Sequence, residues 1–194
     1  MRKIVIATNN AHKAKEISDI LPEYTVLTLS DFDFIGDIDE NGETFLDNAM
    51  IKAREGAKIT KEIVIADDSG LEVDYLGGAP GVHSKRFADT DKERIEKLLS
   101  LLTDVEEEKR GACFKCTVAI ANDEEIIATF VGVVQGKIGY APEGDNGFGY
   151  DPIFIPDGYN NSLAVLSAEE KNAISHRGNA FKKVAHFLKE HYSK

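Results

Sequence analysis

The chain has 194 residues, 42% of them hydrophobic and 29% charged, a composition typical of a globular protein that buries a core without disulfides. Its 23 lysines and arginines against 34 aspartates and glutamates give a formal net charge of −11. A protein this acidic does not coat nucleic acid or anionic membrane through a general positive field, so neither partner is expected. The charge is compatible with a small polyanion held by a local cluster of cations and metal.

Signals for targeting or disulfides are missing from the sequence. No apolar run approaches the roughly 18 residues that a membrane-spanning helix requires, and the short run near the start is interrupted at Thr8. Two cysteines, Cys113 and Cys116, are too few for a disulfide framework. A cytoplasmic protein is the expectation that follows.

Hydrophobic periodicity divides the chain into strands and helices. The strands expected are residues 3–7, 24–29, 63–66, 113–121 and 125–138, with a turn at Asn122 and Asp123 between the last two. The helices expected begin near His12, at Thr44 and at Ser167, and cover residues 90–102 and 177–192. Strands that alternate with helices ahead of a hairpin predict the α/β class, with a mixed twisted sheet flanked by helices.

A turn of small polar residues separates the first strand from the first helix. It consists of Thr8, Asn9, Asn10 and Ala11, followed by His12 and Lys13. Such a turn presents backbone N–H groups at the positive end of a helix, which is a site for an anion. Lys13 stands where the helix dipole disfavours a cation, a placement that bound phosphate explains. A capped helix with a solvated lysine fits the same pattern.

Two adjacent carboxylates, Asp67 and Asp68, follow the buried run 63–66. Because side chains alternate along a strand, the two cannot both point into the core, and one is expected at the mouth of the sheet. A carboxylate there could hold Mg²⁺ or take a proton from water. The alternative is an Asx turn that leads into Gly70.

An acidic stretch precedes the second helix and contains Asp37, Asp39, Glu40 and Glu43. A run of like charges is usually a solvated loop. It contributes to a site only if it folds toward Asp68 to share a cation.

Two later segments carry groups suited to a flat polar ring. Phe148, Gly149, Tyr150 and Asp151 combine aromatic faces with a carboxylate that can read a ring edge, although the loop could equally plug the core. The second segment gathers cations and donors near a helix start, or it is ordinary helix-surface charge. Its members are Lys171, Ser175, His176 and Arg177.

The CxxC spacing of Cys113 and Cys116 leads directly into a strand. A redox CxxC normally begins a helix, and no second pair completes a zinc site, so strand packing is the expected role. A thiol oxidoreductase built on these two cysteines is therefore the weaker hypothesis.

Five segments in order resemble the inosine triphosphate pyrophosphatase family, the HAM1-like noncanonical purine NTP pyrophosphatases. They are IATNNAHKAKE (6–16), ENGETFLDNAMIKA (40–53), IADDSGLEVDYLGGAPGVHS (65–84), GFGYDPIF (147–154) and EEKNAISHRG (169–178). The resemblance implies a single domain over residues 1–194, with two lobes around a central active-site cleft, and a homodimer. It implies hydrolysis of dITP, ITP and XTP to the monophosphate and pyrophosphate with Mg²⁺.

The resemblance also implies a role for each site residue. Asp68 is the general base and a metal ligand, Asp39 or Glu40 is the other metal ligand, and Lys52 neutralises phosphate. The triphosphate is cradled by Thr8, Asn9, Asn10, Ala11, His12 and Lys13, with Ser69 also contacting the substrate. The purine is held by Phe148, Gly149, Tyr150 and Asp151 and read by Lys171, His176 and Arg177. Asn9 stands where relatives often carry glycine, and asparagine tolerates positive φ better than most residues.

Selectivity is expected from hydrogen-bond donors that meet a 6-oxo group, because the 6-amino group of ATP leaves buried donors unpaired. A noncatalytic nucleotide sensor is the competing class of function. It needs the anion loop and the ring pocket but not the paired carboxylates.

Overall fold

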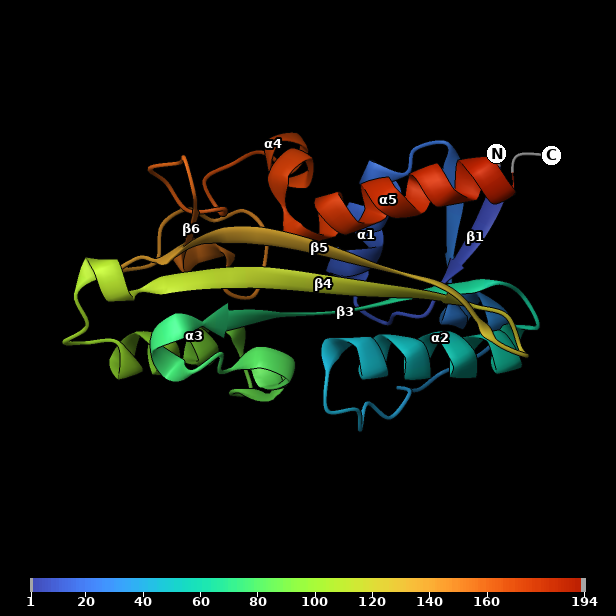
Figure 1. Cartoon of the computed structure of the whole chain (residues 1–194), viewed down its shortest axis with the longest axis horizontal. Coiled ribbons are helices and arrows are strands. Elements are labelled where there is room, and N and C mark those ends of the chain that lie inside the picture. Colours follow the sequence, from blue (N-terminus) through green and yellow to red (C-terminus); the bar gives the residue numbers. More distant parts are fainter. Residues whose placement is uncertain (1, 193–194) are drawn as a thin grey trace. The chain divides into compact units, whose positions relative to one another are not determined.

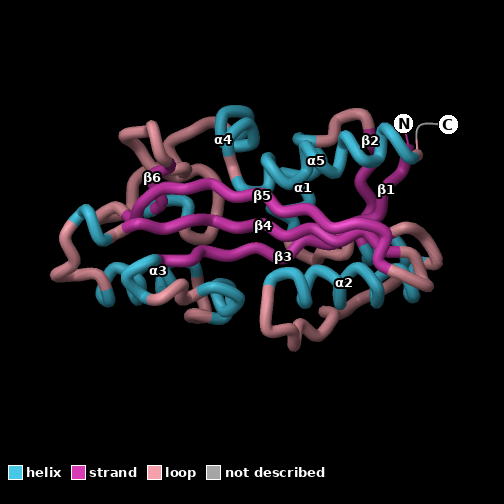
Figure 2. Tube along the Cα trace, viewed as in Figure 1, coloured by secondary structure: helices cyan, strands magenta, loops and turns pink. Residues whose placement is uncertain are grey.

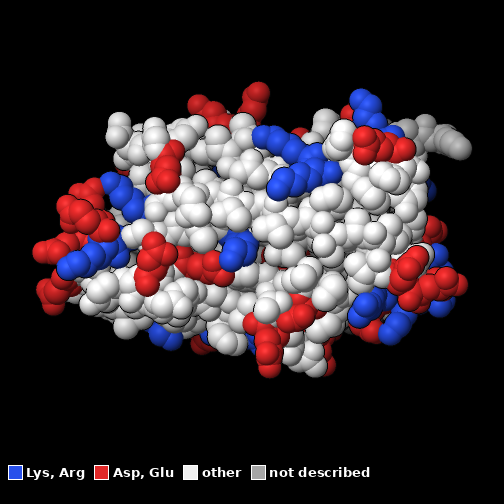
Figure 3. Space-filling model, viewed as in Figure 1, with Lys and Arg blue, Asp and Glu red and all other residues white. Residues whose placement is uncertain are grey.

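The computed structural model describes residues 2–192, which pack as two compact units. Unit 1 contains residues 2–69, 116–132 and 177–192, and unit 2 contains residues 70–115 and 133–176. On the face shown in Figure 3, acidic side chains lie among lysines and arginines. None of the helices within residues 2–192 is long and apolar enough to cross a membrane.

A six-stranded mixed sheet with the order β2-β1-β3-β4-β5-β6 confirms the expected fold class (Figure 2). β1 pairs in parallel with β2 and β3, whereas β5 and β6 are antiparallel. The strands are β1 (Arg2–Ile6), β2 (Tyr24–Thr28), β3 (Val64–Val73), β4 (Gly111–Ala121), β5 (Ile126–Ile138) and β6 (Phe154–Pro156). The hairpin between β4 and β5 turns at Asn122, whose side chain accepts bonds from the amides of Glu124 and Glu125.

Four helices begin at the capping residues that the sequence predicts. Asn10, Thr44, Thr90 and Ser167 each accept a hydrogen bond from a backbone N–H in the first turn, and the last three form capping boxes. The helices are α1 (Ala11–Ile20), α2 (Phe45–Thr60), α3 (Asp91–Leu101), α4 (Ala168–Ile174) and α5 (His176–His191).

Unit 1 is a three-layer arrangement, with α2 on one face of the strands and α1 and α5 on the other (Figure 1). The α2 face packs through small side chains, because Ala49, Ala53 and Ala57 are all fully buried. The opposite face packs through larger ones, including Ile17 of α1 and Phe181 of α5. The start of β3, residues 64–66, is therefore covered on both sides, which explains why this part of the strand is continuously apolar.

Unit 2 has its own core, formed by α3 against β3, β4 and β5 and by the segment around β6. Leu98, Phe114 and Phe154 are among its buried side chains. The glycine-rich loop after β3 has the unusual backbone that its sequence predicts, with positive φ at Gly77 and Gly78.

The prediction that the buried strand ends at Asp67 was wrong, because β3 continues to Val73. Asp67 and Asp68 lie inside the strand, and both are buried. A strand tolerates two buried carboxylates when each is paired with cationic side chains, which is the case here. The same pairs define the candidate site.

Candidate active site

Asp67 and Asp68 project to opposite faces of β3. Asp67 meets Lys13 of α1 and Arg177 of α5, whereas Asp68 meets Lys52 of α2. The alternation expected from the two-residue period of a strand is thus confirmed, although both side chains find partners inside the protein. Unit 1 therefore contains two charge clusters, one on each face of the strand. They are close enough that the charge of Lys13 also acts to lower the pKa of Asp68, and the charge of Lys52 acts to lower that of Asp67.

The Asp68 cluster is built by α2 and by the loop before it. Asn48 and Lys52 are one helical turn apart, and both reach Asp68, from Nδ2 at 3.1 Å and from Nζ at 3.2 Å. The Lys52 ammonium also lies 3.0 Å from Oε2 of Glu40. The acidic stretch thus folds back toward Asp68, the condition under which it contributes to a site.

These contacts shift the pKa values of Asp68 and Glu40 in opposite directions. Burial raises the pKa of Asp68, Lys52 and Lys13 offset the rise only in part, and the charge of Glu40 adds to it. Burial also acts on Glu40, but there Lys52 outweighs it, so the pKa of Glu40 lies below its usual value. Asp68 is consequently the stronger base of the pair, as a general base for water requires.

Glu40 and Asp68 fit the chemistry of Mg²⁺, which takes one or two protein carboxylates and completes its shell with water and substrate phosphates. Asp39, the other candidate ligand, is exposed. Within residues 2–192, no three His, Cys, Asp or Glu side chains group closely enough to hold a metal ion by themselves. The two carboxylates therefore suit a metal shared with substrate rather than a closed structural site.

The turn before α1 is held by its own side chains. Asn10 Oδ1 accepts from the amides of His12 at 2.9 Å and Lys13 at 3.2 Å, and the Thr8 hydroxyl accepts from the amide of Asn10. Asn9 donates its side-chain amide to Gly36 and Asp37 of the acidic loop. Asn9 does not adopt a positive φ. Within residues 2–192, the non-glycine residues that do are Asp33 and Lys61.

The Asp67 cluster joins α1, β3 and α5. Lys13 Nζ lies 2.9 Å from Asp67 Oδ2, and Arg177 donates to the same oxygen at 3.2 Å and to Glu16. The Ser69 hydroxyl donates to Asp67 at 2.8 Å. Burial opposes ionisation, but Lys13 and Arg177 outweigh it and hold the pKa of Asp67 well below its usual range.

Unit 2 holds a buried pair beside an aromatic ring. Asp151 and Lys171 are 2.6 Å apart, with side chains only 4% and 5% exposed. The Lys171 ammonium lies 4.9 Å from the centre of the Phe148 ring, and Asp151 accepts from the Phe148 amide. Gly147 has a φ of 75°, and a Cβ there would lie 2.2 Å from Asp151, so only glycine fits.

Other members of the predicted ring pocket take different positions in unit 2. His176 stacks on Phe114 at 4.7 Å between ring centres, and the amide of Gly149 donates to Asp91. Tyr150 is buried, and its hydroxyl donates to the carbonyl of Ser84. Tyr150 therefore matches the alternative of a core plug rather than a ring contact.

Arg177 belongs to a different unit from the two residues it was grouped with. Lys171 and His176 belong to unit 2, but the guanidinium of Arg177 binds Asp67, Ser69 and Glu16 in unit 1. Its role in reading the purine stays a prediction.

Sequence reasoning missed Glu16 and Asn48. Each stands three or four residues from a predicted lysine on the same helix, Glu16 after Lys13 and Asn48 before Lys52. Helical spacing was the signal that could have found them.

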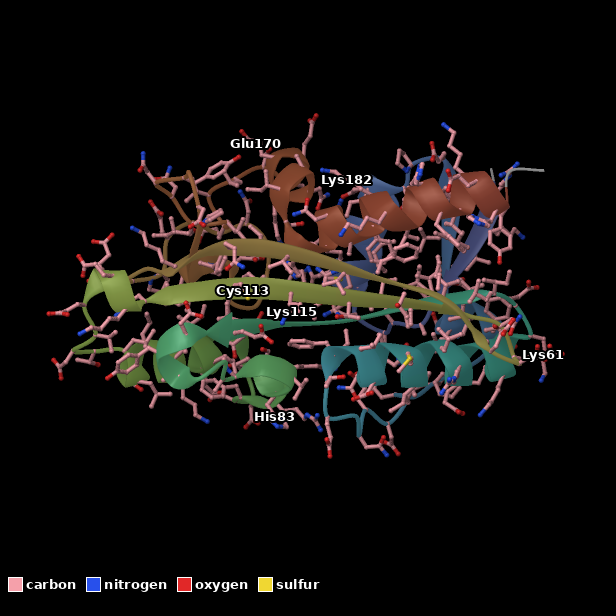
Figure 4. All side chains as sticks on the ribbon, viewed as in Figure 1. Lys61, His83, Cys113, Lys115, Glu170 and Lys182 are labelled. Atoms are coloured by element: carbon pink, nitrogen blue, oxygen red, sulfur yellow. The ribbon has the colours of Figure 1, made fainter. Side chains whose placement is uncertain are left out.

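Both cysteines lie on β4 as packing residues, and both thiols are free. Burial raises the pKa of Cys113 to about 11 and that of Cys116 to about 12, the opposite of an activated redox thiol. Figure 4 shows Cys113 and Lys115 on this strand, where both contact Glu72.

The fold and these clusters define an α/β protein with buried carboxylate–lysine sites. The family model of the Ham1 family matches residues 4–187, and the chain belongs to that family. The resemblance identified from sequence motifs is thereby confirmed.

Close relatives and solved structures agree with this assignment. Two relatives carry the name dITP/XTP pyrophosphatase. That of Bacillus subtilis (strain 168) is 45% identical, covering 97% of this chain and 98% of its own length. That of Listeria monocytogenes serotype 4b is 47% identical, and the match covers 98% of this chain and 96% of the relative. A HAM1 protein structure from Coxiella burnetii is 41% identical with a TM-score of 0.87, covering 98% of this chain and 100% of that one.

Proposed function

We propose that the protein hydrolyses noncanonical purine nucleoside triphosphates, dITP, ITP and XTP, to the nucleoside monophosphate and pyrophosphate. The observation that carries the proposal is the cluster of Glu40, Lys52 and Asp68, a buried base next to a cation and a second carboxylate. Membership of the Ham1 family and the names of the relatives support the same substrate class. Unit 1 is assigned the phosphate chemistry, and unit 2 is assigned recognition of the purine.

The chain's own residues account for the steps at phosphate. Asp68 takes a proton from water, the water oxygen bonds to the α-phosphorus, and the bond from that phosphorus to the bridging oxygen breaks. Pyrophosphate leaves with its charge offset by the ammonium groups of Lys13 and Lys52. The raised pKa of Asp68 suits it to accept that proton.

Mg²⁺ is the metal proposed for Glu40 and Asp68, and when bound it supplies positive charge that activates water and neutralises phosphate. Lys52 contacts both carboxylates and limits their mutual repulsion before substrate and metal arrive.

Selectivity is assigned to the Lys171 ammonium, which Asp151 holds beside the Phe148 ring. A 6-oxo purine presents an acceptor to such a donor and a flat face to the ring. The 6-amino group of ATP would present a donor to this donor, and a buried polar group of the base left without a hydrogen bond costs about 1–3 kcal/mol.

A product assay tests the proposal. Purified protein with Mg²⁺ is given dITP, XTP and dATP, and pyrophosphate and orthophosphate are measured separately. Pyrophosphate from dITP and XTP, with little from dATP, is the expected result. Orthophosphate as the first product would overturn the proposal, and tight nucleotide binding without turnover would favour the sensor.

A homodimer in the cytoplasm completes the proposal, and the family resemblance is what supports it. Light scattering with size-exclusion chromatography tests the assembly, for which a mass of twice 21.3 kDa is expected. Cell fractionation tests the location.

A further inference from the structure

Asp67 has no step in the proposed reaction, although its side chain is fully buried. It lies on the opposite face of β3 from Glu40 and Asp68, so it is not part of the proposed metal site. Its neighbours are instead cations assigned to the substrate. This placement calls for a separate explanation.

We infer that Asp67 is a positioning residue that holds the Lys13 ammonium until a triphosphate or pyrophosphate takes it over. The inference rests on the proposed function, because it takes Lys13 as a ligand of phosphate. In this role Asp67 is an internal competitor of the substrate's own anionic groups.

The contacts of Asp67 are concentrated on one oxygen. Oδ2 accepts from the hydroxyl of Ser69 at 2.8 Å and from Arg177 at 3.2 Å, and it lies 2.9 Å from the Lys13 ammonium. Oδ1 is buried and has no hydrogen-bond partner within residues 2–192. The Cys116 thiol also donates to Oδ2, at 3.9 Å, so two cations, a hydroxyl and a thiol meet the carboxylate at a single atom.

The two cations differ in how firmly they are held. The Arg177 side chain is 2% exposed and is also bound by Glu16, so α1 and α5 both fix it. The Lys13 side chain is 16% exposed and stands in the first turn of α1, next to the turn assigned to phosphate. Lys13 is therefore the cation that can turn to a ligand without opening the core.

The second cation makes this exchange feasible. Removing the partner of a buried charge is normally costly, because the remaining charge is left uncompensated. When Lys13 turns to phosphate, Arg177 and Ser69 remain on Oδ2 and continue to compensate Asp67. The same competition lowers the apparent affinity for pyrophosphate, since only the fraction of Lys13 released from Asp67 is available to it.

A double-mutant cycle on Asp67 and Lys13 tests the inference, with inorganic pyrophosphate as the probe. Calorimetric titration in EDTA keeps the readout independent of metal and turnover. Asp67→Asn, which preserves shape and removes charge, is expected to bind pyrophosphate about tenfold more tightly than wild type. In the Lys13→Met background the same change is expected to give no gain.

Asp19→Asn is the matched control, because it changes the net charge by the same amount at an exposed residue of α1, the helix that carries Lys13, and that residue is paired with Lys15. It is expected to leave pyrophosphate affinity within twofold of wild type. An equal gain in this control would mean that net charge alone is responsible, and it would overturn the inference. Unchanged or weaker affinity in folded Asp67→Asn would also overturn it.

Lys13→Met keeps the inference testable if Asp67→Asn does not fold. This variant is expected to lose about tenfold in pyrophosphate affinity, and unchanged affinity would overturn the inference by itself. Hydrolysis of dITP by the wild type is measured in parallel. Its absence would contradict the proposed function, whereas intact hydrolysis without the affinity changes would contradict the role of Asp67 alone.

Discussion

Asp67 and Asp68 are adjacent in sequence, yet β3 gives them opposite surroundings. Asp67 faces Lys13 and Arg177, whose charges outweigh burial and hold its pKa well below the usual value. Asp68 faces Lys52, but burial and the charge of Glu40 keep its pKa raised. The same residue type at consecutive positions thus gives one permanent anion and one carboxylate able to accept a proton.

Replacing the proton acceptor is expected to have the largest effect. Asp68→Asn keeps the shape of the side chain but cannot take a proton, so kcat for pyrophosphate release from dITP is expected to fall roughly 10³-fold. Asp67→Asn serves as the comparison, with a loss below about tenfold. Near-normal turnover in Asp68→Asn would remove the contrast between the two residues.

Removing the charge of each residue is expected to change the free energy of unfolding by different amounts. At pH 7 in EDTA, Asp67→Asn leaves Lys13 and Arg177 without their shared anion, and the free energy of unfolding is expected to fall by about 3 kcal/mol. Asp68→Asn removes a carboxylate whose charged form burial disfavours, and Glu40 still pairs with Lys52, so a smaller loss is expected. Urea unfolding measures both, and equal losses would contradict the assignment.

The pH dependence follows from the direction of each shift. The folded pKa of Asp67 is below the unfolded value of about 3.9, so its stabilising effect is present above that pH and is lost as the pH falls toward the folded pKa. The difference in the free energy of unfolding between wild type and Asp67→Asn should therefore become smaller below about pH 4. The folded pKa of Asp68 is raised, so any stability it contributes is present below the unfolded value and is lost as the pH rises through the folded pKa.

Unit 2 offers a test of the purine assignment that leaves both aspartates of β3 in place. Asp151→Asn loosens the hold on Lys171, and the preference for dITP over dATP in kcat/KM is expected to fall roughly tenfold. Pyrophosphate affinity should stay unchanged, because the phosphate contacts are in unit 1. Glu169→Gln, an exposed change on α4, is the matched control and should leave the preference intact.

The smallest effect is expected from the thiols. With pKa values raised to about 11 and 12, Cys113 and Cys116 are protonated at pH 8 and should react slowly with iodoacetamide in the folded protein. The double Cys→Ser variant should hydrolyse dITP within about twofold of wild type. Loss of turnover with an intact fold would favour the thiol oxidoreductase.

Local signals in the sequence predicted much of the fold. Caps at Asn10, Thr44, Thr90 and Ser167 fixed where helices begin, because they depend only on residues within one turn. The alternation of a strand placed Asp67 and Asp68 on opposite faces even though the predicted end of that strand was wrong. Such rules involve neighbours along the chain, so a single sequence contains them.

The remaining features depend on contacts between distant segments. Nothing local distinguishes Glu40 from Asp39 until the acidic loop reaches Lys52. Lys171 and Arg177 are six residues apart, but they belong to different units, because the boundary between the units falls after His176, the first residue of α5. Hydrophobic periodicity does not report which unit a residue joins.

The fate of the attacking water tests the central claim most directly. The account holds that Asp68 activates water for attack at the α-phosphorus, so a single turnover of dITP in ¹⁸O-labelled water should place the label in the monophosphate. Mass spectrometry of the two products should find pyrophosphate unlabelled. Label in pyrophosphate or in orthophosphate would locate the attack at another phosphorus and contradict the account.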